Sequence, residues 1–156
     1  MTSKRDIQDK VQRILAKNYQ VNLAPDGGYF VKFGSTFVVI DVREPTFSPV
    51  TKEEDSFYVR IGAPLLFGVE ASNELFEYVS TARLGGLVGL SLDLQEHPEN
   101  PRHYDLILGT SILGNFLDED ELVNAVTICA YVADANDDDL ANMFGGSVAD
   151  PDGNFR

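Results

Sequence analysis

The sequence predicts an α+β fold in which three helices pack against an antiparallel five-stranded sheet. Five segments alternate apolar and polar residues with a period of two, as half-buried strands do, and three segments repeat apolar residues at helical spacing. The strands come in a run of three and a run of two, which favours antiparallel pairing over the strand–helix alternation of parallel sheets. We therefore expect the order α-βββ-α-ββ-α in one domain over residues 1–146, with residues 147–156 as a flexible C-terminal tail.

The first helix is predicted to begin after Ser3. Serine is a favoured N-cap, and Asp6 places a carboxylate near the positive end of the helix dipole. Four apolar residues that would face the core then recur at helical spacing, namely Ile7, Val11, Ile14 and Leu15.

The first three predicted strands follow this helix. A glycine-serine turn joins strands 29–33 and 36–42 into a hairpin. Residues 45–56 form a polar loop with two prolines, and the third strand covers residues 57–69, where the alternation is clearest. Because Pro64 lacks an amide donor, we expect this strand to bend there or to lie at a sheet edge.

A second helix and two further strands are predicted next. Ser72 is the expected N-cap, and the glycine pair 85–86 is expected to end the helix. Strands 88–94 and 103–113 alternate in the same way as the earlier ones and are connected by the proline-bearing loop 96–101. The apolar positions of the helix are Leu75, Phe76, Val79 and Ala82.

The third helix is predicted to start at Asp118. Glu121 follows three residues later, as in a capping box. The apolar stripe that would face the core consists of Leu122, Val126, Cys129, Ala130 and Ala133.

The segment 134–144 contains four aspartates and two asparagines. A calcium-binding EF-hand loop needs a glycine at its sixth position and a glutamate at its twelfth, and Asp139 and Gly145 occupy these positions here. We therefore do not expect a calcium site. We expect Asp137 or Asp138 to cap a short last helical turn that ends at Gly145.

Composition excludes several classes of partner. The net charge of −13 and the pI near 4.3 argue against nucleic acid, because binding its phosphate backbone requires concentrated Lys and Arg. Asp6 and Asp9 interrupt the N-terminal residues, so we expect no signal peptide, and no apolar run approaches the roughly 18 residues of a membrane span. A single cysteine excludes an internal disulfide. We expect a cytoplasmic protein with no membrane partner.

The residues that most often perform chemistry form no recognisable site. His97 and His103 flank a hairpin loop without metal-ligand spacing, and we expect both to be exposed. Cys129 lies on an apolar stripe, where a thiol is inert. No phosphate-binding or nucleophile motif occurs, and the acidic residues 53–55 form only a charge cluster in a loop. We expect no enzyme, no cofactor and no metal. An unrecognised hydrolase would need a pocket with clustered carboxylates.

The predicted sheet and the second helix carry more apolar surface than one copy of the chain would bury. Phe37 and Val39 alternate with the core positions of their strand, and Tyr58 would join them on the opposite face of the sheet. Two explanations stay open, and both can hold together. In one, these three residues bind a peptide of a protein client by strand addition or helix docking. In the other, a homodimer covers the surface, with Phe76 and Val79 in the dimer contact.

Three segments resemble the YbjN-type domain, which belongs with the type III secretion chaperone-like (TY-chaperone) proteins. They are YFVKFGSTFVVIDV, FYVRIGAPLLFGVEASNELFEYVS and LDEDELVNAVTICAYVADANDDDLANMFGG, and the resemblance extends over about residues 5–146. It implies a type III secretion chaperone-like fold and a non-enzymatic, often dimeric scaffold that holds partner segments. The acidic composition would favour partners with basic segments, through attraction that weakens with salt.

Overall fold

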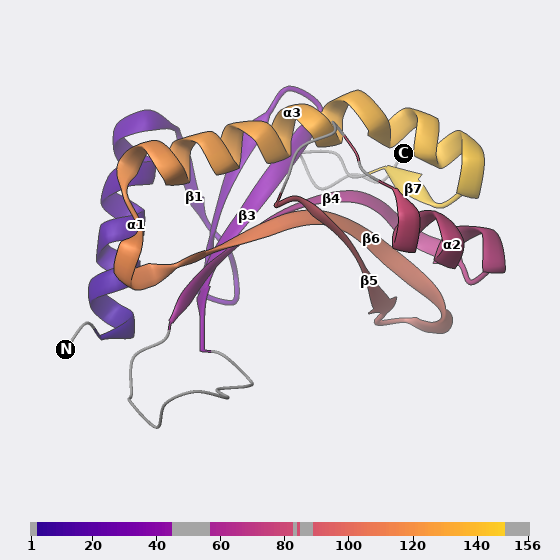
Figure 1. The fold of residues 1–156 in the computed structure, drawn as a ribbon, viewed down its shortest axis with the longest axis horizontal. Coiled ribbons are helices and arrows are strands. Elements are labelled where there is room, and N and C mark those ends of the chain that lie inside the picture. The colour runs from indigo at the N-terminus through magenta and orange to yellow at the C-terminus, as the bar shows by residue number, and fades with distance from the viewer. Residues whose placement is uncertain (1–2, 45–56, 83, 85–88, 149–156) are drawn as a thin grey trace.

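The computed structural model describes residues 3–44, 57–82, 84 and 89–148 (Figure 1). The predicted loop 45–56, the glycine pair 85–86 and residues 149–156 of the predicted tail lie outside the described residues. The described elements are, in chain order, α1 (Lys4–Asn18), β1 (Val21–Leu23), β2 (Tyr29–Phe33), β3 (Thr36–Arg43), β4 (Tyr58–Glu70), α2 (Asn73–Thr81), β5 (Ser91–His97), β6 (Asn100–Leu113), the 3-10 helix η2 (Gly114–Phe116), α3 (Glu119–Phe144) and β7 (Ser147–Val148).

The predicted α+β class with an antiparallel sheet is confirmed. Within the described residues seven strands form one open sheet in the order β1-β2-β3-β4-β6-β5, with β7 paired to β4, and every pairing is antiparallel. The predicted number of five strands was too low. The two additional strands, β1 and β7, are short, and β7 begins inside the segment predicted to be a flexible tail, because Ser147 and Val148 pair with Phe67 and Leu66.

The helices lie together on one face of the sheet. In Figure 1, α3 runs along the top of the sheet and α1 lies at its left-hand end, and α3 contacts β3, β4, β6 and α1. α2 lies near the other end of α3, where Tyr78 contacts Phe144 with ring centroids 5.2 Å apart. The largest fully buried side chains fill the layer between helices and sheet; they include Ile7, Leu15, Ile40, Ile61, Leu108, Leu122 and Leu140.

The predicted helix starts are confirmed. Ser3 accepts a hydrogen bond from the Asp6 amide, and the Asp6 carboxylate accepts one from the Ser3 amide, so a full capping box begins α1. Ser72 accepts from the amide of Leu75 at the start of α2. Asp118 caps α3 in the same way, through the amide of Glu121 at 2.7 Å.

The acidic stretch of α3 differs from the prediction. α3 continues without interruption to Phe144 and is capped by Gly145 at φ 73°, so neither Asp137 nor Asp138 caps a separate helical turn. Leu140 is 2 % exposed, and its burial continues the core-facing stripe of the helix beyond Ala133. The helix therefore persists because its apolar side stays packed, and most of the aspartates form its outer side.

Pro64 lies in the central part of the sheet and not at its edge. β4 pairs with both β3 and β6, but its pairing with β3 ends at Gly62. The register with β6 then shifts between Pro64 and Leu66. The prediction was a bend at Pro64 or a position at a sheet edge; β4 as a whole is not an edge strand, but its regular pairing is interrupted at Pro64, and the proline is tolerated because β3 no longer pairs with β4 there.

Candidate binding face of the sheet

The described helices leave one face of the sheet uncovered, and we call it the open face. Side chains alternate along a strand, so β3 directs Val38, Ile40 and Val42 into the core and its intervening residues to the other side. The cross-strand register then assigns residues of the neighbouring strands to the same side. The open face includes Phe30, Lys32, Phe37, Val39, Asp41, Arg43, Tyr58, Arg60, Gly62, Asp93, Ile107, Gly109, Ser111 and Leu113.

The structure places the three sequence-predicted binding residues on this face, at two separate positions. Phe37 and Val39 lie beside Phe30, whose ring meets that of Phe37 edge-on with centroids 6.4 Å apart and an interplanar angle of 73°. Gly62 of β4 is the register partner of Val39, and Tyr58 lies four residues away from Gly62 along the same strand. At the usual rise of a strand, Tyr58 is therefore about 13 Å from the position of Val39. All three predicted side chains are half-buried.

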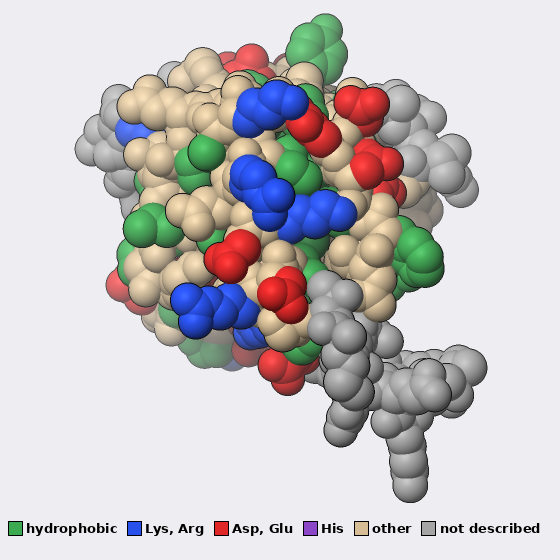
Figure 2. All heavy atoms as spheres, turned by 90° about the vertical axis from the view of Figure 1, so that its left-hand side faces the viewer, with side chains coloured by type: hydrophobic (Ala, Val, Ile, Leu, Met, Phe, Trp, Pro, Cys, Tyr) green, Lys and Arg blue, Asp and Glu red, His purple; other side chains and the backbone are tan. Residues whose placement is uncertain are grey.

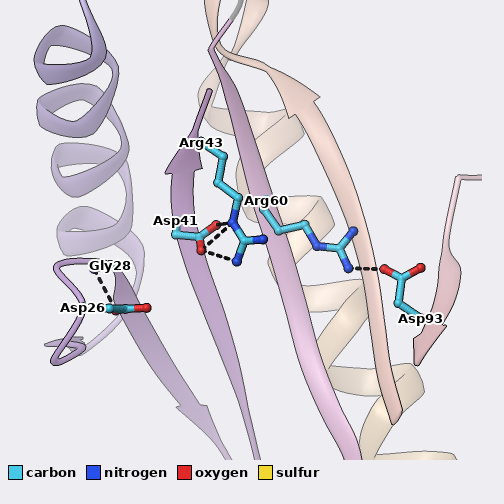
Figure 3. A network of polar contacts seen from close by, with 6 residues as sticks. All are labelled: Asp26, Gly28, Asp41, Arg43, Arg60 and Asp93. Carbon is cyan, nitrogen blue, oxygen red and sulfur yellow. Dashed lines mark hydrogen bonds and ion pairs between the residues drawn. The ribbon is translucent and has the colours of Figure 1, made fainter. Parts of the chain in front are cut away.

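A pair of glycines forms the middle of the open face. Gly62 of β4 and Gly109 of β6 are register partners. The guanidinium of Arg60 lies over Gly109, because a Cβ added there would be 3.1 Å from Nη2 and 3.2 Å from Cζ of Arg60. The same guanidinium donates to the Asp93 carboxylate on β5, as Figure 3 shows. β6, which contains Gly109, lies between β4 and β5 in the sheet. A side chain on Gly109 would occupy the space that Arg60 uses to reach Asp93.

A second ion pair lies on β3. Arg43 donates from Nε to Asp41 Oδ1 at 3.0 Å and from Nη2 to Asp41 Oδ2 at 2.7 Å (Figure 3). This hydrogen bonding is the main cause that raises the pKa of Arg43. Both arginines of the open face therefore have a carboxylate partner within the protomer, and the face presents paired charges beside apolar side chains. Sequence reasoning missed these pairs, although the alternation that selected Phe37 and Val39 also places Asp41 and Arg43 on the same side.

The predicted dimer contact lies on α2 and only part of it is accessible. Phe76 is 42 % exposed and meets Tyr104 edge-on at 5.7 Å between centroids. Val79 is half-buried against the core of its own protomer. Of the two predicted residues, Phe76 therefore offers most of the free apolar surface.

The two histidines are less exposed than predicted. His97 belongs to β5, and its Nδ1 lies 2.7 Å from Asp105 Oδ1, an oxygen that also accepts from the amide of Gly68. His103 belongs to β6, and its Nδ1 is buried with no hydrogen-bond partner among the described residues. Both are half-buried residues of paired strands, because the hairpin between β5 and β6 is tighter than the predicted loop.

Other candidate chemistry is limited in the part of the chain that the structure describes. Cys129 is fully buried, and burial raises the pKa of its thiol to about 11. Within the described ranges, no three His, Cys, Asp or Glu side chains gather closely enough to hold a metal ion. Among the described helices, none is long and apolar enough to cross a membrane.

Comparison with known proteins assigns no family. No protein-family model matches the chain, and no curated protein matches it either. The likeness to the YbjN-type domain therefore stays a prediction that rests on the three segments quoted above.

Proposed function

We propose that the protein is a non-enzymatic, chaperone-like module that binds a peptide segment of a protein client on the open face. The single observation that carries this proposal is the clustering of Phe30, Phe37 and Val39 on a sheet surface that no described helix covers. Half-buried aromatic side chains can bury further area against a ligand at little conformational cost. The resemblance to type III secretion chaperone-like proteins supports the same function.

The open face also has features that would orient a bound segment. The Arg43–Asp41 pair lies on β3, and the Arg60–Asp93 pair extends over Gly109, so a bound segment would meet paired charges at both positions. Paired charges contribute more to selecting a ligand's register than to affinity, because their mutual hydrogen bonds already satisfy them. Affinity would then come mainly from the aromatic cluster, and Phe37 is the residue to change first.

The test is peptide binding by defined variants. Peptides of about twelve residues would be selected from a displayed library, and the dissociation constant of the best one measured by fluorescence anisotropy. Phe37→Asp should weaken binding at least about tenfold, which corresponds to about 1.4 kcal/mol. Tyr131→Asp is the matched control, because it adds the same charge at an aromatic residue that is 77 % exposed on α3.

Two results would contradict the proposal. One is a selection that yields no peptide binding above background. The other is equal affinity in the Phe37→Asp variant, the Tyr131→Asp variant and the unaltered protein, provided that thermal unfolding shows all three to be folded. Val39→Lys gives a second, independent variant of the same cluster.

Self-association through the open face is a second candidate function. Leu113 lies on this face beside Tyr58 and is 58 % exposed, and Phe116 follows it at 77 %. Leu113 adds apolar surface to the open face away from the aromatic cluster, and Phe116 adds exposed apolar area on the adjoining η2, as a homodimer contact would require. Sedimentation velocity across a dilution series distinguishes the candidates: a dimer that Leu113→Asp dissociates, combined with no peptide binding, would favour self-association alone.

A further inference from the structure

α1 and the beginning of α3 enclose a cleft that is separate from the open face. Its volume is about 420 Å³. Lys10, Arg13 and Lys17 follow one another at positions i, i+3 and i+7 and therefore lie on one side of α1. The residues that line the cleft are Lys10, Arg13, Ile14, Lys17, Asp118 and Glu119.

The three cations of the cleft differ in the hydrogen-bond and ion-pair partners that they have within the protein. Lys10 Nζ donates to the carbonyl oxygen of Leu117, and Lys17 Nζ lies 2.8 Å from Glu119 Oε1. Arg13 is exposed, and its guanidinium has no hydrogen bond or ion pair to any described residue. The cleft therefore holds one complete guanidinium donor set and two ammonium groups that keep further donors free.

Lys10, Arg13 and Lys17 form a cationic stripe on α1, in contrast to the acidic composition of the whole chain. α1 contains five of the twelve basic residues and two acidic ones, a local charge of +3 in a chain of net charge −13. Figure 2, which faces the side of the molecule where α1 lies, shows Lys and Arg side chains gathered near its middle with hydrophobic atoms between them. The cleft therefore brings three cations together with two carboxylates, Asp118 and Glu119, on a molecule whose net charge is negative.

We propose that this cleft binds an acidic, amphipathic segment of a partner protein. Arg13 can hold a carboxylate through two parallel N–H donors, and Lys10 and Lys17 can each receive a further carboxylate. Lys10 and Lys17 are seven residues apart, which is about 10 Å along the helix, so a peptide with several carboxylates can engage all three cations whereas a single phosphate cannot. Ile14, which is 7 % exposed, adds a small apolar contact between them. Nucleic acid is disfavoured, because its continuous phosphate charge would also meet the acidic surfaces beside the cleft.

The test uses a fluorescein-labelled peptide of alternating glutamate and leucine, with glutamine–leucine and lysine–leucine peptides of equal length. The glutamate peptide should bind, and Arg13→Glu should raise its dissociation constant at least about tenfold, while Arg13→Lys should raise it less because the fork of donors is lost but the charge remains. Arg5→Glu is the matched control: Arg5 is exposed on α1 but does not line the cleft, and the change in net charge is identical. It should alter the dissociation constant less than about threefold.

Four outcomes would overturn the proposal. The glutamine peptide could bind as tightly as the glutamate peptide, which would indicate apolar binding alone. Arg5→Glu could weaken binding as much as Arg13→Glu, which would indicate only long-range attraction. Inorganic phosphate at millimolar concentration could displace the peptide fully, which would indicate a small-anion site. Arg13→Glu could dissociate a dimer of the protein in sedimentation, which would make a second copy the occupant.

Binding of an acidic segment in the cleft and binding of a peptide on the open face can be tested separately. Phe37→Asp should leave binding of the glutamate peptide unchanged, since Phe37 does not line the cleft. Arg13→Glu should likewise leave unchanged the affinity of a peptide selected for the open face.

Discussion

Replacing Gly109 by alanine should destabilise the protein, whereas replacing its cross-strand partner Gly62 should not. A Cβ at Gly109 would lie 2.8 Å from the carbonyl oxygen of Ile61 and 3.1 Å from Arg60 Nη2. The carbonyl belongs to a paired strand and cannot move away without disturbing the sheet. A Cβ at Gly62 would meet the Ile107 Cγ2 methyl at 3.3 Å, which a small side-chain rotation relieves.

The magnitudes follow from two opposing contributions. Forcing an extra carbon into a packed site costs about 1–3 kcal/mol, and replacing a glycine stabilises by about 0.4–1 kcal/mol through the unfolded chain. For Gly109→Ala the steric cost prevails, and we expect a loss of about 1–2 kcal/mol. For Gly62→Ala the two contributions nearly cancel, and the change should stay within about 0.5 kcal/mol.

Urea unfolding followed by circular dichroism measures both variants, and the melting temperature of Gly109→Ala should fall by roughly 2–8 °C. A double-mutant cycle with Arg60→Ala separates the two contacts, because part of the cost of Gly109→Ala should disappear when the guanidinium is absent. If Gly109→Ala and Gly62→Ala lose equal stability, or if Gly109→Ala loses none, Arg60 and the backbone of β4 do not approach Gly109 closely. Either result would refute the described geometry of the open face.

Three further predictions concern the helices. Since burial raises the pKa of the Cys129 thiol to about 11, iodoacetamide at about pH 8 should modify the native protein at least about a hundredfold more slowly than the urea-unfolded protein, as followed by mass spectrometry. Asp118→Ala should cost about 1 kcal/mol through loss of the N-cap, whereas Asp120→Ala, also in the first turn, should cost less in thermal melts. The hydrogen bond from Lys17 is the main cause that lowers the pKa of Glu119. The ionised Glu119 carboxylate therefore stabilises the fold at pH values above its ordinary pKa of 4.5, and this stabilisation is lost as the pH falls through the lower pKa of the native protein. Glu119→Gln should therefore lose less stability than the unaltered protein between about pH 6 and about pH 3 in urea titrations.

The sequence was sufficient for features that depend on local chemistry. Ser3, Ser72 and Asp118 identify the starts of the helices, because an N-cap needs one side-chain oxygen and a free amide within three residues. Strict alternation identified β3 and the first part of β4, since it fixes which face each side chain occupies. Beyond Pro64 the register shifts, and Leu65 and Leu66 are both buried although alternation places them on opposite faces. The placement of Phe37 and Val39 on a face away from the core followed from that alternation alone.

Features that depend on distant partners were not predictable in the same way. β1 has three residues and β7 has two, so neither is long enough to show a period, and each forms because a neighbouring strand offers pairing groups. The aspartates near Asp138 suggested a helix break, but packing of Leu140 against the core outweighs their weak helix propensity. The ion pair between Arg60 and Asp93 joins residues 33 positions apart and requires the register of three strands.

Net charge alone is a poor guide to the partners of this protein, because its charges are unevenly distributed. α3 contains seven acidic residues and no basic one, whereas α1 contains the cationic stripe. Four of these carboxylates lie in residues 134–139 of α3, whereas Glu119 lines the cleft together with the cations of α1, so positive side chains are concentrated at α1 although the total charge is negative. Within about a Debye length, near 10 Å at moderate salt, the local charge determines the attraction. The net charge of −13 predicts basic partners for the molecule as a whole, and the distribution predicts an acidic partner at the cleft between α1 and the beginning of α3, where cations are concentrated.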